Sequence, residues 1–308
     1  MTVFLNYDQA ELDRQYDQRA WAPNASEAIR RYGENSDSVR VRLGEPQTHA
    51  YGPSAFETLD LYRCQGGVAP LHVFIHGGAW RLLSKRESAF PAELFVRAGA
   101  HFAALDFAPL PTVTLTEMAR QVRRAIAWCY RHAEAIGADR RRIFVSGHSS
   151  GAHLAALVAV TDWGQFGMPP GIVNGAMCAS GIYDLRPVRL SARNAYVQLS
   201  CEMEQALSPL RHVGQIGCDL IVAVAELESD EFRRQASAFV DAAGDRAALV
   251  RGKGFNLSNS SRRSRIAKAC SAPQPWRRWG LRLPRPVEAR ICAPRAGASR
   301  APCPHRQR

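Results

Sequence analysis

Apolar runs alternate with amphipathic segments through the middle of the chain. Five continuous apolar runs predict buried strands, at 71–75, 102–107, 143–147, 172–179 and 219–225. Four segments beside them have helical spacing, at 87–98, 115–134, 151–161 and 229–243. Strands that are buried on both faces show such continuous runs, and their alternation with helices is typical of βαβ units. The pattern therefore predicts an α/β fold with a mostly parallel central sheet and helices on both faces.

The first 65 residues carry weaker patterns. Residues 8–35 have helical spacing with many charges and a break at Pro23 and Asn24, which predicts two short helices on the surface. Residues 38–43 and 58–63 alternate polar and apolar side chains, as half-buried strands do. We therefore expect two antiparallel strands before the parallel part of the sheet.

The run at 143–147 leads directly into Gly147-His148-Ser149-Ser150-Gly151, and an alanine-rich helical pattern follows. In the order strand, sharp turn, helix, a Gly-x-Ser-x-Gly sequence places its serine at the tip of a turn. Gly147 and Gly151 have no Cβ atoms and so let strand and helix approach, which would leave Ser149 exposed as a nucleophile above the sheet. Such a short pattern also arises by chance, but the flanking strand and helix favour the nucleophile.

A second motif follows the run at 71–75, where the chain reads His76-Gly77-Gly78-Ala79-Trp80. Backbone N–H groups of consecutive glycines after a strand can point at the oxyanion that develops in acyl transfer. Gly77 and Gly78 are therefore candidate oxyanion donors, and the N–H of Ser150, next to the nucleophile, is the remaining one. The alternative is that this glycine pair is only a flexible turn.

With both motifs in this order, the chain resembles an α/β-hydrolase of the esterase and lipase type, most closely the bacterial arylformamidases (kynurenine formamidases). The matching segments are Tyr16 to Ala20, Tyr51 to Pro53, Glu57 to Leu61, Phe74 to Arg81, Gly147 to Leu154, Ser180 to Leu185, Leu207 to Leu210 and Ala225 to Phe232. The resemblance implies the α/β-hydrolase fold and a serine hydrolase for a small ester or an aryl formamide such as N-formylkynurenine, in tryptophan breakdown. It implies no cofactor and no metal. In that family the N-terminal region helps to cover the active-site entrance.

The acid of a serine triad follows a later strand, in the order Ser, acid, His. The run at 219–225 is that strand, and four acids come after it, at 226, 228, 230 and 231. Relatives carry Ala-Glu-Leu-Asp here, so the resemblance favours Glu228 as the carboxylate that orients the imidazole. Asp230 is the second choice. The alternative is that these acids only cap the following helix and offset its macrodipole.

The histidine of the triad is missing from its expected place. Relatives carry Asn-His-Phe-Asp after a further strand, whereas here Gly254 precedes Phe255 and Asn256. No residue from 213 to 304 is a histidine. A serine hydroxyl needs a base within hydrogen-bond reach. The alternative function is therefore a catalytically impaired or inactive family member.

The remaining histidines near the motifs have other expected roles. We expect His76 to brace the oxyanion loop, His148 to fill the variable elbow position and His153 to lie on the elbow helix. His305 is close to the end of the chain. Tyr183 and Asp184 are expected to form a packed turn, with substrate contact as the alternative.

Charge divides the chain in two. The net charge is +12, yet residues 251–308 hold 15 Lys or Arg and one acid, so residues 1–250 carry 25 basic and 27 acidic side chains. We predict an α/β-hydrolase domain over 1–250 and a basic, Arg/Pro-rich, disordered tail over 251–308. Our hypothesis is that the reading frame departs from the ancestral one near 244–258, which leaves the fold incomplete at its C-terminal end. A nucleic-acid-binding arm around Trp276 and Trp279 ranks last.

Further features narrow the function classes. No apolar run approaches the roughly 18 residues that span a membrane, and the first eight residues lack a signal-peptide pattern, so a cytoplasmic location is expected. The eight cysteines form no C-x-x-C pair, which favours reduced, buried thiols. We therefore expect a small-molecule substrate and neither nucleic acid nor membrane as a partner. The oligomeric state stays open.

Overall fold

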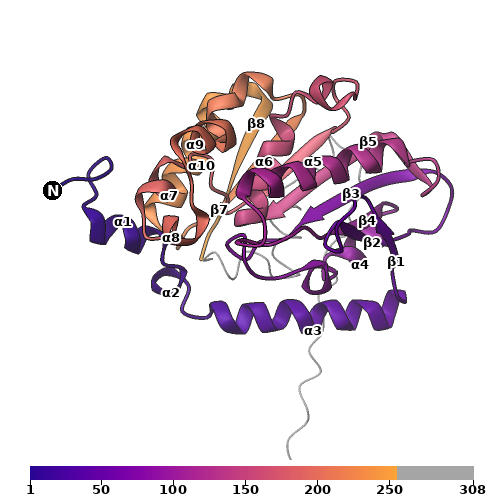
Figure 1. The fold of residues 1–308 in the computed structure, drawn as a ribbon. Helices are drawn as coiled ribbons and strands as arrows, with labels where there is room; N and C mark the ends of the chain where they lie inside the picture. The colour runs from indigo at the N-terminus through magenta and orange to yellow at the C-terminus, as the bar shows by residue number, and fades with distance from the viewer. Residues whose placement is uncertain (255–308) are drawn as a thin grey trace, which may run out of the picture.

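A computed structural model describes residues 1–254, and a single sheet runs through the middle of them (Figure 1). The sheet has eight strands in the order β1-β2-β4-β3-β5-β6-β7-β8. Their bounds are β1 Gln47–Ala50, β2 Thr58–Tyr62, β3 Ala69–Ile75, β4 His101–Leu105, β5 Ala138–His148, β6 Gly175–Ala179, β7 Asp219–Ala225 and β8 Ala247–Gly252. The pairs β1/β2 and β2/β4 are antiparallel, and the other neighbours are parallel. The predicted α/β fold is confirmed.

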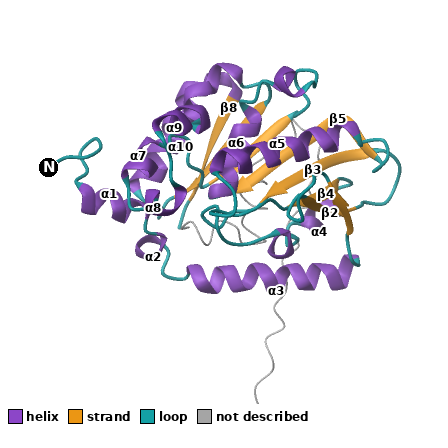
Figure 2. Cartoon of the chain, viewed as in Figure 1, coloured by secondary structure: helices purple, strands orange, loops and turns teal. Residues whose placement is uncertain are grey.

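Helices cover both faces of this sheet (Figure 2). The α-helices are α1 Gln9–Tyr16, α2 Gln18–Trp21, α3 Ala25–Leu43, α4 Ala92–Arg97, α5 Leu115–Arg131, α6 Ser150–Ala159, α7 Arg186–Leu190, α8 Asn194–Val197, α9 Cys201–Leu207 and α10 Asp230–Ala243. Short 3-10 helices are η1 Lys85–Ser88, η2 Trp163–Phe166, η3 Pro209–Gln215 and η4 Gly244–Arg246. In Figure 1, α5 and α6 lie in front of the sheet and α3 runs along one side of the molecule.

Two apolar cores form because successive strand residues point to opposite faces. In β3, Leu71, Val73 and Ile75 belong to the core that α5, α6 and α10 share. Phe74 belongs to the other core, which contains residues of α3 and α4. Each fully buried large apolar side chain contributes about 1.5 to 3 kcal/mol, so both cores hold the sheet in place. The predicted domain boundary at 250 falls inside the strand β8. Residues 255–308 of the predicted tail lie outside the described residues.

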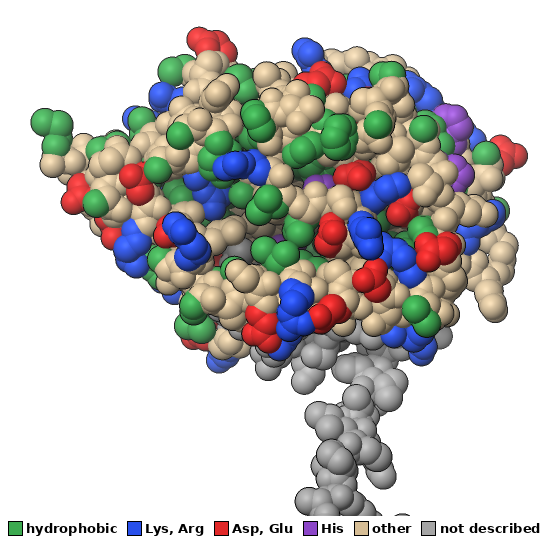
Figure 3. Space-filling view, turned by 60° about the horizontal axis from the view of Figure 1, so that its bottom comes forward, with side chains coloured by type: hydrophobic (Ala, Val, Ile, Leu, Met, Phe, Trp, Pro, Cys, Tyr) green, Lys and Arg blue, Asp and Glu red, His purple; other side chains and the backbone are tan. Residues whose placement is uncertain are grey.

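The predicted strand at 38–43 is wrong, because these residues end the helix α3. The buried positions of α3 are Ala28, Ser36 and Val39, which have helical spacing. This spacing extends over many more residues than the six in which polar and apolar side chains alternate. Surface pairs such as Arg40 with Asp37 support the helix, and Figure 3 shows acidic and basic side chains mixed over this face.

The edge position next to β2 belongs instead to β1, whose Gln47, Thr48 and Ala50 are exposed. The sequence analysis missed this strand because an edge strand that is open to solvent carries no apolar run. The predicted helix at 87–98 is also shorter than expected: it divides into η1 and α4, with Pro91 at the N-cap of α4. Proline lacks the backbone N–H that a helix interior needs.

Some functional classes find no support within residues 1–254. No described helix is long and apolar enough to cross a membrane. No cluster of three or more His, Cys, Asp or Glu side chains in this part of the chain is arranged to hold a metal ion. The described cysteines are unpaired, and four of the five are buried.

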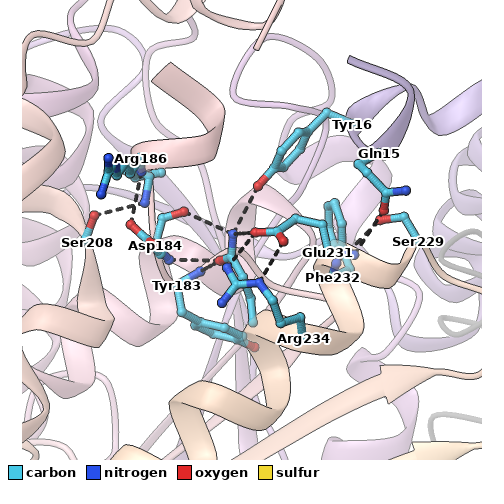
Figure 4. Close-up of polar contacts among 12 residues, drawn as sticks. Gln15, Tyr16, Tyr183, Asp184, Arg186, Ser208, Ser229, Glu231, Phe232 and Arg234 are labelled. Carbon is cyan, nitrogen blue, oxygen red and sulfur yellow. Dashed lines mark hydrogen bonds and ion pairs between the residues drawn. The ribbon is translucent and has the colours of Figure 1, made fainter. Parts of the chain in front are cut away.

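A buried amide in α10 ties the N-terminal helices to the body of the fold. The Gln235 Oε1 accepts from the backbone N–H groups of Tyr183 and Asp184, at 2.6 and 2.8 Å. Its Nε2 donates to Tyr16 Oη at 3.0 Å and to Glu231 Oε1 at 2.9 Å. Figure 4 shows Tyr16, Asp184 and Glu231 converging from separate segments. Since these groups are buried, Gln235 fixes α1 against α10 and the segment before α7.

We expect Gln235→Met to lower the free energy of unfolding by about 2 to 4 kcal/mol, because several buried polar groups then lose their partner. Urea denaturation measures the change. The control is Gln205→Met in α9, where the side chain is exposed, and it should leave the stability unchanged. Equal stability of both variants would contradict the assigned role of Gln235.

Candidate active site

Ser149 lies in the sharp turn between β5 and α6, with φ 55° and ψ −121°. L-residues rarely adopt this region, and holding one there costs about 1 to 3 kcal/mol. The neighbours leave no room for side chains: a Cβ on Gly147 would lie 2.1 Å from the Gly151 carbonyl oxygen, and one on Gly151 would lie 2.2 Å from that of Ile75. The two glycines therefore have the close-packing role that the motif predicts.

The expectation that Ser149 is exposed is wrong, since only 3% of its surface is accessible. The turn points toward the N-terminal helices, and α2 covers it. The Gln18 Nε2 of α2 lies 3.4 Å from Ser149 Oγ. Within the described residues this amide is the only side-chain group within hydrogen-bond distance of the hydroxyl.

The loop after β3 lies directly against this turn. A Cβ on Gly77 would be 2.6 Å from the His148 carbonyl oxygen and 3.3 Å from Ser149 Cβ. Gly78 has φ 101°, and Ala79 and Trp80 follow with φ 54° and 61°. Positive φ values are uncommon for residues other than glycine, so the surroundings hold Ala79 and Trp80 in this conformation. Among the described residues, the N–H groups of Gly77, Gly78 and Ser150 donate no hydrogen bond.

Trp80 fastens this loop to α6. Its backbone N–H donates to Ser150 Oγ at 3.1 Å, and its indole Nε1 donates to His153 Nδ1 at 3.3 Å. His153 Nε2 then donates to the Leu207 carbonyl at 2.8 Å. Both ring nitrogens of His153 are therefore engaged, which makes this residue a structural link between loop and helix.

The other histidines near the site also have structural contacts. His76 Nδ1 donates to the Gly77 carbonyl at 2.9 Å, its Nε2 faces Asp106 at 3.5 Å, and its ring stacks on Phe107 at 4.2 Å. This agrees with the expected bracing of the loop. The His148 ring lies edge-on to Tyr32 at 6.5 Å. Neither histidine has Ser149 Oγ as a hydrogen-bond partner in the described structure.

Glu228 is buried just after β7, with 1% of its surface accessible. Its Oε1 accepts from Ser180 Oγ at 2.6 Å and from the Ala225 N–H at 2.8 Å. Its Oε2 is buried and accepts no hydrogen bond from the described residues. Burial raises the pKa of this carboxyl to about 7, against the opposing effect of its two donors.

Glu228 borders a small void of about 10 Å3, enough for one water molecule. Gln18 and Glu228 line this void together with Gln15, Tyr16, Trp21, Ala22, Ser229 and Phe232. Gln18 thus contacts Ser149 and borders the same void as Glu228.

The other acids after β7 have different surroundings. Asp230 begins α10, pairs with Arg233 and has a side chain that is 60% exposed. Glu231 is fully buried and forms a two-pronged ion pair with Arg234 at 2.7 Å. Glu226 Oε2 accepts from the Gly254 N–H at 2.8 Å. None of the four acids caps α10, because Ser229 is its N-cap and accepts from the Phe232 N–H at 3.4 Å, whereas Asp230 and Glu231 lie in its first turn.

Gly254, the position where the resemblance leads us to expect histidine, ends the described part of the chain. It has φ 68°, and a Cβ built on it would meet nothing within 4 Å. His305 lies outside the described residues, as do residues 255–258 of the predicted frame departure near 244–258. Tyr183 is fully buried and stacks on Phe239 at 4.4 Å, which agrees with a packed turn.

The sequence analysis did not assign roles to Gln18, Trp80 and Ser180. Each acts on a residue that is at least 48 positions away in the chain. All three lie in segments that carry the resemblance, and that was the only available signal. Their place inside the matching segments was therefore the one sequence signal that could have indicated a role in the site.

Comparisons with known proteins identify the family and the fold. The family model BD-FAE matches residues 59–168. Kynurenine formamidase from Danio rerio is 33% identical over 79% of this chain and 85% of its own length. The Salmo salar kynurenine formamidase is 32% identical with the same coverage. A structure described as a candidate thioesterase from Silicibacter sp. TM1040 has a TM-score of 0.71 and 25% identity, covering 81% of this chain and 92% of that one.

The buried histidines give a testable pH dependence. Burial lowers the pKa of His153 to about 4 and that of His72 to about 3. Below the ordinary value of about 6.5, the unfolded chain binds protons that the native state does not bind, so stability falls as the pH falls. Each histidine contributes up to about 1.4 kcal/mol per pH unit.

We expect His153→Gln to reduce this pH slope of the unfolding free energy, measured by urea denaturation between about pH 7 and about pH 5. The exposed His132→Gln is the control and should keep the slope. An unchanged slope in His153→Gln would show that this ring takes up its proton in the native state.

Proposed function

Since this chain belongs to the α/β-hydrolase family that contains kynurenine formamidases and related esterases, we propose that it hydrolyses a small ester or aryl formamide through Ser149. The observation that carries this proposal is the strained turn at Ser149, which lies against a loop with free N–H groups. Backbone strain of this kind persists where the surroundings enforce it, and it is frequent at catalytic serines.

In this reaction Ser149 Oγ attacks the carbonyl carbon, its proton passes to a water molecule, and the carbonyl electron pair moves onto the oxygen. The protonated water later gives this proton to the departing alcohol or amine. The N–H groups of Gly77, Gly78 and Ser150 stabilise that oxyanion. The loop that carries Gly77 and Gly78 need not rearrange during the reaction, because Trp80 already holds it on α6. The carbon–oxygen bond of an ester, or the carbon–nitrogen bond of a formamide, then breaks, and water releases the acyl or formyl group.

The substrate class follows from the family and from the setting of the site. N-formylkynurenine is the proposed substrate, because the relatives are named kynurenine formamidases. A small molecule suits a serine that is covered by α2, whereas a polymer would need an open groove. Residues 1–250 carry 25 basic and 27 acidic side chains, so this part of the chain offers no basic surplus for nucleic acid.

The first test compares purified protein with Ser149→Ala on N-formylkynurenine and on p-nitrophenyl acetate. We expect slow turnover that the substitution removes. A missing general base lowers such a rate by roughly 10²- to 10⁴-fold, which leaves the contribution of the oxyanion donors. If Ser149→Ala turns over substrate as fast as the parent chain, the assigned nucleophile is wrong.

A second candidate is a member of the family that has lost catalysis. The observation that favours it is the neighbour of Ser149, because an amide cannot take the proton of a hydroxyl as an imidazole can. Gly254 stands where relatives carry histidine, and the buried Glu228 has no imidazole to orient among residues 1–254.

Restoring the histidine separates the two candidates. We expect Gly254→His to raise the Ser149-dependent rate by at least about tenfold, since a positioned base contributes roughly 10²- to 10⁴-fold. The Cβ has room there, although the left-handed backbone costs the variant some stability. The control is Lys253→His, one position earlier. Equal rates for the two variants would contradict Gly254 as the position of the base.

A further inference from the structure

A further cavity lies away from Ser149, between α5, the C-terminal end of α6, η2 and the segment from α9 to η3. Its volume of about 550 Å3 is in the range of pockets that hold small organic molecules. Ser149 precedes the other end of α6, and a helix of ten residues is about 15 Å long. This cavity is therefore separate from the candidate active site.

The inner wall of this cavity is apolar. Four residues of the main core line it, Ala127, Leu157, Val160 and Leu207. Phe166 also lines it and is half-buried. An apolar group that lies against such a wall loses its contact with water, which is favourable. The wall therefore suits the hydrocarbon part of a small molecule.

Four arginines also line the cavity, at positions 120, 123, 124 and 131. Arg123 is half-buried, its Nε donates to Thr161 Oγ1 at 3.0 Å, and its guanidinium carbon lies 5.9 Å from the centre of the Phe166 ring. Within residues 1–254 no carboxylate pairs with it. Burial, and after it the charge of Arg120, lowers the pKa of the Arg123 guanidinium. This partly desolvated charge would be stabilised by any anion that reaches it.

The other three arginines are less available to a ligand. Arg124 pairs with Glu57 and Glu117, at 2.6 and 3.0 Å, and Arg120 lies 3.8 Å from Glu117. Arg131 is exposed and donates to a backbone carbonyl at 3.2 Å. The half-buried guanidinium on the wall therefore provides the main positive charge for a ligand, which favours an anion with a single negative charge.

We propose that this cavity binds a small organic carboxylate with an apolar or aromatic body, with the carboxylate on Arg123 and the body against the apolar wall. The Nε of Arg123 is engaged by Thr161, which leaves the two terminal nitrogens to hold both carboxylate oxygens. Asp162 also lines the cavity, and its charge disfavours ligands with two negative charges, such as a phosphate dianion. The proposal does not depend on Ser149 as a nucleophile, so the two can fail separately.

The experiment is isothermal titration calorimetry of the full-length protein with hydrocinnamate, a phenyl ring on a short carboxylate chain. We expect saturable binding that Arg123→Met weakens at least about tenfold, because the methionine fills similar space without the charge. Hydrocinnamide, the neutral amide of the same shape, should bind the parent chain and Arg123→Met equally weakly. The control is Arg30→Met on α3, an exposed arginine on the other side of the sheet, and it should bind hydrocinnamate as the parent does.

A second variant blocks the cavity and leaves its charges in place. Ala206 is exposed in α9 and lines the cavity, so Ala206→Trp places a large ring there without disturbing the core. We expect at least about tenfold weaker binding of hydrocinnamate, since ring and ligand compete for the same space. The matched control is Gln205→Trp, the adjacent exposed position outside the lining, which should bind normally. This variant also serves if Arg123→Met does not fold.

Four results would overturn the proposal. These are no saturable binding by the parent chain in the millimolar range, equal binding by the parent and Arg123→Met, unchanged binding by Ala206→Trp, and tighter binding of inorganic phosphate than of hydrocinnamate. The last result would show an anion site that ignores the apolar body. Ser149→Ala should bind hydrocinnamate as the parent does, whatever its effect on hydrolysis, because Ser149 lies at the other end of α6.

Discussion

The close approach of three backbone segments around Ser149 is the constraint on which the site depends. Gly147 meets the carbonyl of Gly151, Gly151 meets that of Ile75, and Gly77 meets that of His148. Any side chain at these positions would separate β5, α6 and the loop after β3. The left-handed conformation of Ser149 and the free N–H groups beside it follow from this packing, because no other arrangement fits a strand, a turn and a helix at such distances.

A second consequence concerns how the site is closed. Gln235 holds Tyr16 against α10, and Tyr16 is two residues before Gln18. The cover over Ser149 is therefore anchored by a buried polar network rather than by apolar contacts alone, and such networks specify one arrangement when every member is satisfied. The same helices bring an amide to the serine and to the border of the void at Glu228. The segment around Gln18 therefore both covers Ser149 and contacts its hydroxyl.

The two carboxylate oxygens of Glu228 have different surroundings. Ser180 and the Ala225 N–H hold one carboxylate oxygen, as a scaffold for an orienting acid requires. The other oxygen is buried and accepts no hydrogen bond from the described residues. Burial therefore dominates and raises the pKa of this carboxyl to about 7. The acid of a catalytic triad stabilises the positive charge of an imidazolium. Within residues 1–254 no histidine forms a hydrogen bond with Glu228.

Local pattern determined much of this protein from the sequence alone: the parallel strands, the elbow at Ser149, and the loop at Gly77 and Gly78. These features depend on residues that are close together in the chain, so periodicity and motif spacing reveal them. Alternation over six residues was too short a signal to separate a strand at 38–43 from the end of α3. Only the tertiary structure decided that Ser149 is covered, that Gln18 borders the void at Glu228, and that Ser180 holds the acid. The contacting residues are 131 and 48 positions apart, and no local pattern encodes which distant segments pack together.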